Sequence, residues 1–248
     1  MSGNLNVTRP ENRKRILMLA ANPSTSTVTG WPVGFWWAEL THPWWAFVEA
    51  GYEVEIRSLN GGALLADGYS DPEDASGYSA ADVLSLGFKK SPTHAALLEN
   101  TRDVSDVKAA DWDAIFVVGG QSPMFTFRGN QALQRLLASF YEAGKITALV
   151  CHGTCALLDT RLSNGELLVK GKTWTGFANS EEKYADQFVG QRIQPFWIED
   201  EARAIPDTNF VVDQMFREFA VRDGLLVTGQ QQFSGAAAAR LVIEAIGR

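Results

Sequence analysis

The 248-residue sequence is poor in cysteine and histidine and has more acidic than basic residues, and these shortages exclude several classes of protein. Two cysteines cannot build a disulfide framework, so a reducing, cytoplasmic location is expected. Three histidines and two cysteines leave few ligands for a metal site. The net charge of −7 argues against nucleic acid as a partner, because neutralising phosphates takes clustered lysine and arginine.

Long hydrophobic runs are also missing. No apolar stretch approaches the roughly 20 residues of a membrane span, and Met1 to Lys14 is polar, without the hydrophobic segment of a signal peptide. Hydrophobic residues still make up 46% of the chain, enough for a sizeable core. No internal linker divides the chain. We therefore expect a single domain over residues 1–248 and no membrane partner.

Short apolar segments alternate with amphipathic ones along the chain. This order is typical of an α/β fold, a mostly parallel sheet with helices on both faces. The first part predicts strands at 15–21, 53–58, 112–118 and 146–150, and helices at 38–50 and 130–143. The second part predicts a hairpin at 167–173, a helix at 196–202, strands at 210–212 and 225–228, and a closing helix at 234–246.

Residues 63–105 interrupt the alternation. They mix aspartate with glycine, serine and proline, and contain one predicted helix at 93–100. Insertions of this length between strands are usually functional, so we interpret this one as a small cap.

The segment from Ile146 to Leu158 is the centre of the predicted site. Apolar strand residues end at Cys151, and His152 and Gly153 lead into an alanine- and leucine-rich predicted helix. A nucleophile at such a turn is a nucleophile elbow, in which Gly153 relieves crowding. The free amides and the dipole of the helix N-terminus would favour a Cys151 thiolate. The alternative is a buried structural cysteine followed by a surface histidine.

Five of the eight tryptophans lie between Trp31 and Trp45, and Glu39 is among them. Burial in such apolar company would raise the pKa of Glu39 and keep it protonated, able to donate a hydrogen bond. The alternative places Glu39 on the solvent face of its helix. The nearby His42 is interpreted as structural.

Gly119 and Gly120 follow the strand predicted at 112–118. Two residues without a Cβ at the end of a parallel strand let backbone amides approach a ligand, as an oxyanion hole requires. A simple tight turn is the alternative.

Four segments together resemble the ThiJ/PfpI superfamily of class I glutamine amidotransferase-like proteins. The similarity is greatest to the branch that contains the heat-inducible chaperones with glyoxalase III activity. The resemblance implies a flavodoxin-like fold and a homodimer. The four segments are Gly34–Pro43, Val117–Gly120, the Cys151–His152 elbow, and Gly171–Phe177 leading to Glu181 and Glu182.

The resemblance also implies roles for the residues of these segments. Cys151 would be the nucleophile, His152 the general acid and base, and Glu39 the carboxyl that hydrogen-bonds the sulfur. Glu181 would orient His152, with Glu182 as a second candidate.

An oxyanion site would be formed by Gly120 and the amide of His152, with Gly119 and Gly153 beside them. The implied reaction converts a small carbonyl substrate, a 2-oxoaldehyde such as methylglyoxal, into a 2-hydroxy acid. It needs no cofactor and no metal.

Two departures from the family pattern leave the substrate open. Gln121 and Ser122 stand where glyoxalase-type members tend to have His-Gly, and Gln231-Gln232 replaces an Asn-Pro. The tryptophans would also make the pocket mouth bulkier than a three-carbon substrate needs. Two further hypotheses therefore stay beside the glyoxalase: another cysteine-dependent hydrolase or hydratase with a larger apolar substrate, and a stress holdase or redox sensor.

Overall fold

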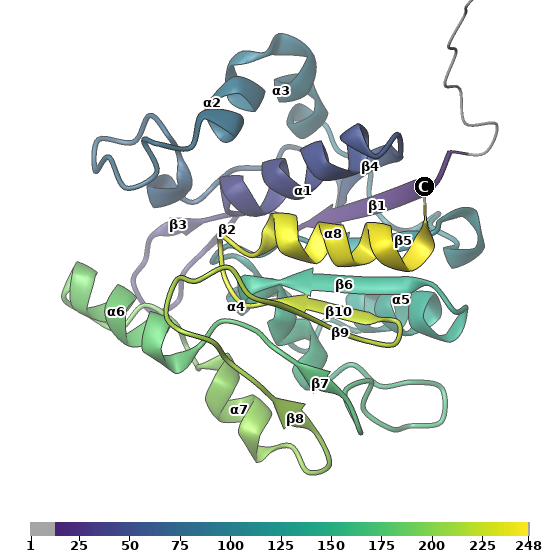
Figure 1. Ribbon diagram of the computed structural model, residues 1–248. Coiled ribbons are helices and arrows are strands. Elements are labelled where there is room, and N and C mark those ends of the chain that lie inside the picture. The colour runs from purple at the N-terminus through teal and green to yellow at the C-terminus, as the bar shows by residue number, and fades with distance from the viewer. Residues whose placement is uncertain (1–12, 248) are drawn as a thin grey trace, which may run out of the picture.

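The structure, a computed structural model, describes residues 13–247 (Figure 1). At its centre is a six-stranded sheet with the strand order β4-β1-β5-β6-β10-β9. All neighbouring strands pair in parallel except β9, which runs antiparallel to β10. The strands are β1 (Arg15–Ala20), β4 (Glu53–Ser58), β5 (Ala114–Val117), β6 (Ile146–Val150), β9 (Ala220–Asp223) and β10 (Leu226–Gly229).

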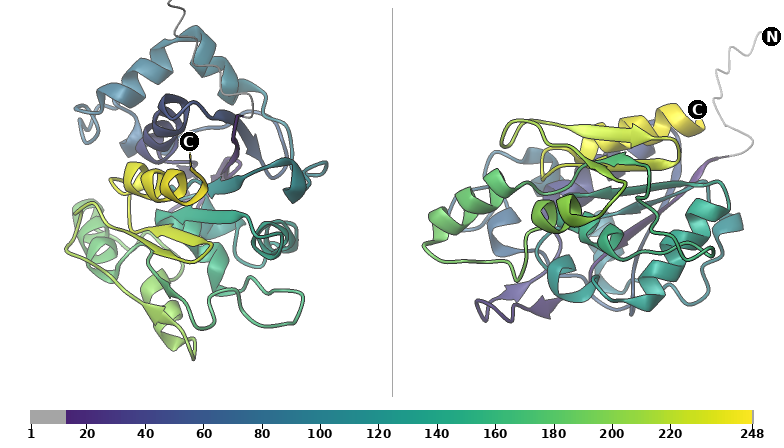
Figure 2. Two further views of the ribbon diagram at one scale, coloured as in Figure 1. Left: turned by 45° about the vertical axis from the view of Figure 1, so that its right-hand side comes forward. Right: turned by 90° about the horizontal axis from the view of Figure 1, so that it is seen from below.

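Helices cover both faces of this sheet (Figure 2). Helices α1 (Trp37–Glu49) and α8 (Gly235–Ile246) pack against each other on one face, and α5 (Gln131–Glu142) packs against β5 and β6 on the other. Every residue of β5 and β6 is buried, as expected for strands that are covered on both sides. The predicted α/β fold with a mostly parallel sheet is confirmed.

Shorter elements surround the sheet. Two small two-stranded sheets pair β2 with β3 and β7 with β8. No helix within residues 13–247 is long and apolar enough to cross a membrane. The shorter elements are β2 (Ser24–Thr25), β3 (Pro32–Val33), β7 (Thr173–Trp174), β8 (Asn209–Phe210), α4 (Pro123–Thr126), α6 (Asn179–Val189), α7 (Ile198–Ala204) and three 3₁₀ helices at Gly68–Ser70, Ala109–Asp111 and Cys151–Leu158.

The insertion at 63–105 contains two α-helices, of which the sequence predicted only the second. Helix α3 (Pro92–Glu99) lies within a residue of its predicted bounds, whereas α2 (Val83–Lys90) was missed. The Asp82 side chain caps α2 by accepting the backbone N–H of Ser85 at 3.1 Å. The Ser85 hydroxyl also lies 2.7 Å from that of Thr41 in α1, which fixes α2 on α1. A cap and a tertiary contact thus stabilise a helix of only eight residues.

Two expectations for the second half of the chain were wrong in detail. The predicted hairpin at 167–173 is absent: residues 167–172 form successive turns, in which the Lys170 N–H donates to the Leu167 carbonyl and the Lys172 N–H to the Val169 carbonyl. The next strand, β7, pairs in parallel with β8. Because β8 is distant in the sequence, the local pattern could not predict this pairing. The helix predicted at 196–202 lies two residues later, at α7.

The chain before α1 crosses the end of β5 at very close range, and Gly120 permits the crossing. Gly120 has a φ of 103°, and a Cβ there would lie 2.6 Å from backbone atoms of Gly34, Phe35 and Trp36. The same crossing brings α1, and with it Glu39, to the carboxyl edge of the sheet.

We expect Gly120→Ala to lower the free energy of unfolding by roughly 3 kcal/mol, because backbone strain and a clash with backbone atoms add. Gly129→Ala is the matched control: Gly129 also has a positive φ, of 72°, but a Cβ there meets nothing within 4 Å. The control should lose only about 1 kcal/mol. Urea unfolding curves measure both values, and equal losses would show that the close crossing contributes nothing.

Candidate active site

Cys151 stands on a sharp turn directly after β6. Its φ is 53°, a left-handed conformation that is strained for a residue with a side chain. The segment that follows is a 3₁₀ helix, in which the Thr154 hydroxyl donates to the Cys151 carbonyl at 2.6 Å. Cys151 as a whole is 2% exposed, and it lines a pocket at the carboxyl edge of the sheet. This strained turn is the geometry of a nucleophile elbow.

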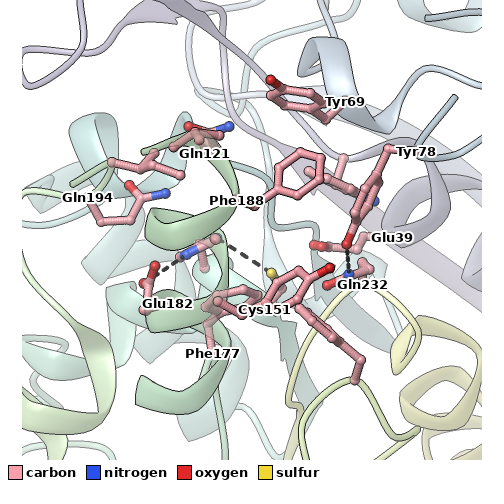
Figure 3. A pocket seen from close by; sticks show the side chains of 17 residues that line it. Glu39, Tyr69, Tyr78, Gln121, Cys151, Phe177, Glu182, Phe188, Gln194 and Gln232 are labelled. Atoms are coloured by element: carbon pink, nitrogen blue, oxygen red, sulfur yellow. Dashed lines mark hydrogen bonds and ion pairs between the residues drawn. The ribbon is translucent and has the colours of Figure 1, made fainter. Parts of the chain in front are cut away.

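His152 lies between the thiol and a carboxyl group. Its Nδ1 is 3.5 Å from the Cys151 sulfur, and its Nε2 is 3.1 Å from Oε1 of Glu182 (Figure 3). The imidazole also stacks on Phe177, with ring centroids 4.2 Å apart. The histidine is therefore buried and held on both sides, and the alternative of a surface histidine is wrong.

The carboxyl that contacts His152 belongs to Glu182, whereas the resemblance had favoured Glu181. Glu181 accepts hydrogen bonds from the backbone N–H of Ala178 and of Phe216, each at 3.0 Å, and from Nε2 of Gln230 at 2.9 Å. It thus closes the first turn of α6 and ties that helix to the chain before β9. Successive helical residues point about 100° apart, so only the position of α6 decides which glutamate faces His152.

Glu39 is fully buried in the first turn of α1, beside Cys151. Burial raises the pKa of Glu39 to about 8, although the thiol of Cys151 and the charge of His152 oppose the rise. The contacts of the carboxyl with the Cys151 thiol and with the backbone of Gly119 favour ionisation, but they do not offset the cost of burying the charge. Glu39 is therefore a protonated acid at neutral pH, as the apolar surroundings predicted.

The pKa of the thiol differs from the sequence prediction. Burial raises the pKa of Cys151 well above its ordinary value, and the neighbouring Glu39 raises it further. Burial by itself would lower the pKa of His152, but the Glu182 carboxylate outweighs it and the net shift is upward. The resting thiol keeps its proton, and the adjacent imidazole is a strengthened base for removing it.

Three glycines at the site serve close packing. A Cβ on Gly119 would lie 2.7 Å from the Val150 carbonyl oxygen and would also strike the Glu39 carboxyl. A Cβ on Gly153 would lie 3.0 Å from the carbonyl oxygen of Val118. Like Gly120, these residues let the strand ends and α1 converge on the thiol. Their oxyanion role stays a prediction.

The pocket above the thiol has a cavity volume of about 80 Å³, and apolar and aromatic side chains make up most of its lining. Of the five clustered tryptophans, only Trp36 lines it. Trp44 and Trp45 instead pack against each other and His94. Within residues 13–247 no group of three or more His, Cys, Asp or Glu side chains is arranged to hold a metal ion.

Sequence reasoning missed Asp67, a buried carboxyl in the insertion. Its two oxygens accept the backbone N–H of Gly34 at 2.8 Å and of Gln121 at 2.6 Å. Burial raises the pKa of Asp67 to about 7, against the effect of these two hydrogen bonds. Asp67 joins the insertion to both loops that frame the site. In the sequence it is one aspartate of an acidic loop, with no local signal of burial.

The fold and the site together define a class: α/β proteins with a cysteine on a nucleophile elbow at the carboxyl edge of a parallel sheet. The chain belongs to the DJ-1/PfpI family, whose sequence pattern matches residues 33–245.

Several known relatives match along most of their length. The chain is 25% identical to Glyoxalase 3 of Candida albicans, covering 94% of this chain and 98% of the relative. It is also 25% identical to the Glutathione-independent glyoxalase HSP31 of Saccharomyces cerevisiae, with the same two coverages. The crystal structure of glyoxalase III from Candida albicans superposes with a TM-score of 0.76 at 24% identity, over 94% of this chain and 98% of that one. That superposition supports the fold.

The raised pKa of Glu39 predicts a pH-dependent stability. Above pH 4.5 the carboxyl is ionised in the unfolded chain but protonated in the folded one, so its contribution to stability falls as pH rises towards 8. Glu39→Gln removes this dependence. We expect its unfolding free energy, relative to wild type, to increase by about 1 kcal/mol per pH unit between pH 5.5 and 7.5.

Urea unfolding at both pH values measures the difference, and any constant effect of the amide cancels in the comparison. A difference between the two proteins that does not change with pH would contradict a protonated, buried Glu39.

Proposed function

We propose that the protein is a cofactor-independent enzyme of the glyoxalase III type, which converts a 2-oxoaldehyde into a 2-hydroxy acid. The observation that carries the proposal is the chain of contacts from Cys151 through His152 to Glu182 inside one pocket, with protonated Glu39 beside the sulfur. The relatives named as glutathione-independent glyoxalases support the same reaction.

In the first proposed step, the Cys151 sulfur adds to the aldehyde carbon C1 while His152 takes the thiol proton. His152 then gives this proton to the aldehyde oxygen, which forms a hemithioacetal and leaves the imidazole neutral for the next step. Glu39 would donate a hydrogen bond to the Cys151 sulfur. The backbone N–H groups of Gly120 and His152 would donate hydrogen bonds to the oxygen on which negative charge develops.

In the second step, His152 removes the hydrogen of C1 as a proton and a proton is returned to C2 through an enediol. C1 is thereby oxidised to a thioester and C2 is reduced from a ketone to an alcohol, so the electrons balance without an outside oxidant. Water then cleaves the C1–sulfur bond, which releases the 2-hydroxy acid and restores the thiol.

A second candidate is another cysteine-dependent hydrolase or hydratase with a larger apolar substrate, supported by the mostly apolar and aromatic lining of the pocket. A holdase or redox sensor remains the alternative outside enzymology. We further propose one domain over residues 1–248 with the insertion as its cap, and a cytoplasmic homodimer. Strongly exposed apolar side chains in the insertion, such as Leu65 and Val83, support a partner contact.

The reaction is tested by converting methylglyoxal to lactate without glutathione. We expect wild type to turn over at about 1 s⁻¹ or faster and Cys151→Ala to show no activity. Cys155→Ala is the matched control, since Cys155 is buried outside the pocket with its thiol on the Pro123 carbonyl, and it should retain activity. A slow Cys151-dependent reaction would favour the second candidate, and no such reaction would favour the holdase.

Glu182 is expected to act by positioning and charging His152. Glu182→Gln should lower kcat about 100-fold and move the acid limb of the pH profile to lower pH, because the loss of the carboxylate lowers the pKa of His152. Glu181→Gln, one residue away, should leave that limb in place. Profiles of kcat/KM against pH decide between them, and a shift in the Glu181 variant alone would reverse the assignment.

A further inference from the structure

The pocket above Cys151 has an aromatic side made from two distant parts of the chain. Tyr69 and Tyr78 come from the insertion, and Phe188 comes from α6. The Phe188 ring centroid lies 5.8 Å from that of Tyr69 and 6.0 Å from that of Tyr78. Figure 3 shows the three rings together on the side of the pocket that also holds Glu39. We call Tyr69, Tyr78 and Phe188 the aromatic clamp.

The clamp is open to solvent at the pocket mouth. Phe188 is 53% exposed and Tyr78 is 36% exposed, although both line the pocket. Large apolar rings that face water around a reactive thiol favour a ligand that covers them. An aromatic group could take an edge-to-face or offset position against these rings, as they do with each other.

The polar groups of the pocket favour an uncharged ligand. No lysine or arginine is among the described residues that line it, whereas the carboxyls of Glu39 and Glu182 are. An anionic substrate would therefore lose its hydration without gaining a cationic partner other than His152. The unpartnered carboxamide oxygens of Gln121 and Gln194 are instead suited to accept hydrogen bonds from substrate hydroxyls.

We propose that the aromatic clamp makes the enzyme selective for uncharged 2-oxoaldehydes that carry an aryl group, in preference to methylglyoxal. The inference rests on the proposed function. The aryl ring would lie against the clamp while the aldehyde carbon reaches the Cys151 sulfur. Phenylglyoxal and water would give mandelate by the same internal transfer, in which C1 is oxidised, C2 is reduced and no further reactant is needed.

The first experiment compares kcat/KM of wild type for phenylglyoxal, methylglyoxal and 4-carboxyphenylglyoxal. We expect phenylglyoxal to be preferred over methylglyoxal by about tenfold or more. The carboxylated compound has the same ring and a negative charge, and it should fall about tenfold or more below phenylglyoxal. A methylglyoxal preference would overturn the role of the clamp, and good turnover of the carboxylate would overturn the selection against charge.

The second experiment removes one ring of the clamp. Phe188→Ala should lower kcat/KM for phenylglyoxal about tenfold and change that for methylglyoxal less than about threefold. Phe233→Ala is the matched control, because Phe233 is 49% exposed and lies outside the lining of this pocket. Equal losses on both substrates in Phe188→Ala would mean that the ring is only structural.

The two proposals fail in different ways. If none of the three compounds is turned over in a Cys151-dependent manner, the glyoxalase reaction itself is wrong. If methylglyoxal is turned over as well as phenylglyoxal or better, the reaction stands and only the selectivity is wrong.

Discussion

The site is arranged around one constraint: the Glu39 carboxyl is buried beside the Cys151 thiol, away from water. Two ionisable groups are buried side by side in one space, and burial favours the neutral form of each. The backbone must come unusually close to create that space. Gly119 and Gly120 admit it, because a Cβ on either would strike α1 or the chain that leads into it.

The same dry environment explains why the thiol needs a neighbouring base. Burial disfavours a free thiolate, and the helix N-terminus does not overcome it. His152 can take the proton because Glu182 stabilises the imidazolium. The proton then stays within a buried pair, where attack on a carbonyl and transfer of the proton are coupled. Glu39, already protonated, is free to act as a donor.

The chemistry and the selectivity of this pocket come largely from different parts of the fold, and α6 joins them, because it carries both Glu182 and Phe188. The elbow and α1 belong to the sheet and its covering helices, and they carry Cys151, His152 and Glu39. The aromatic side comes from the insertion and from α6, which contact each other through Tyr69, Tyr78 and Phe188. Such an arrangement allows the substrate to change while the nucleophile and its base stay in place.

The sequence by itself determined the α/β alternation, the position of the elbow at Cys151 and the choice of Glu39 as a candidate buried acid of the site. These depend on local patterns: the period of apolar residues, a cysteine at a strand end, and an acid in apolar company. Tertiary structure alone decided that Glu182 and not Glu181 contacts His152. Both are glutamates in the same helix, and only the placement of that helix determines which side chain faces the histidine. It also decided the pKa of the thiol, since burial depends on what the distant parts of the chain place around it.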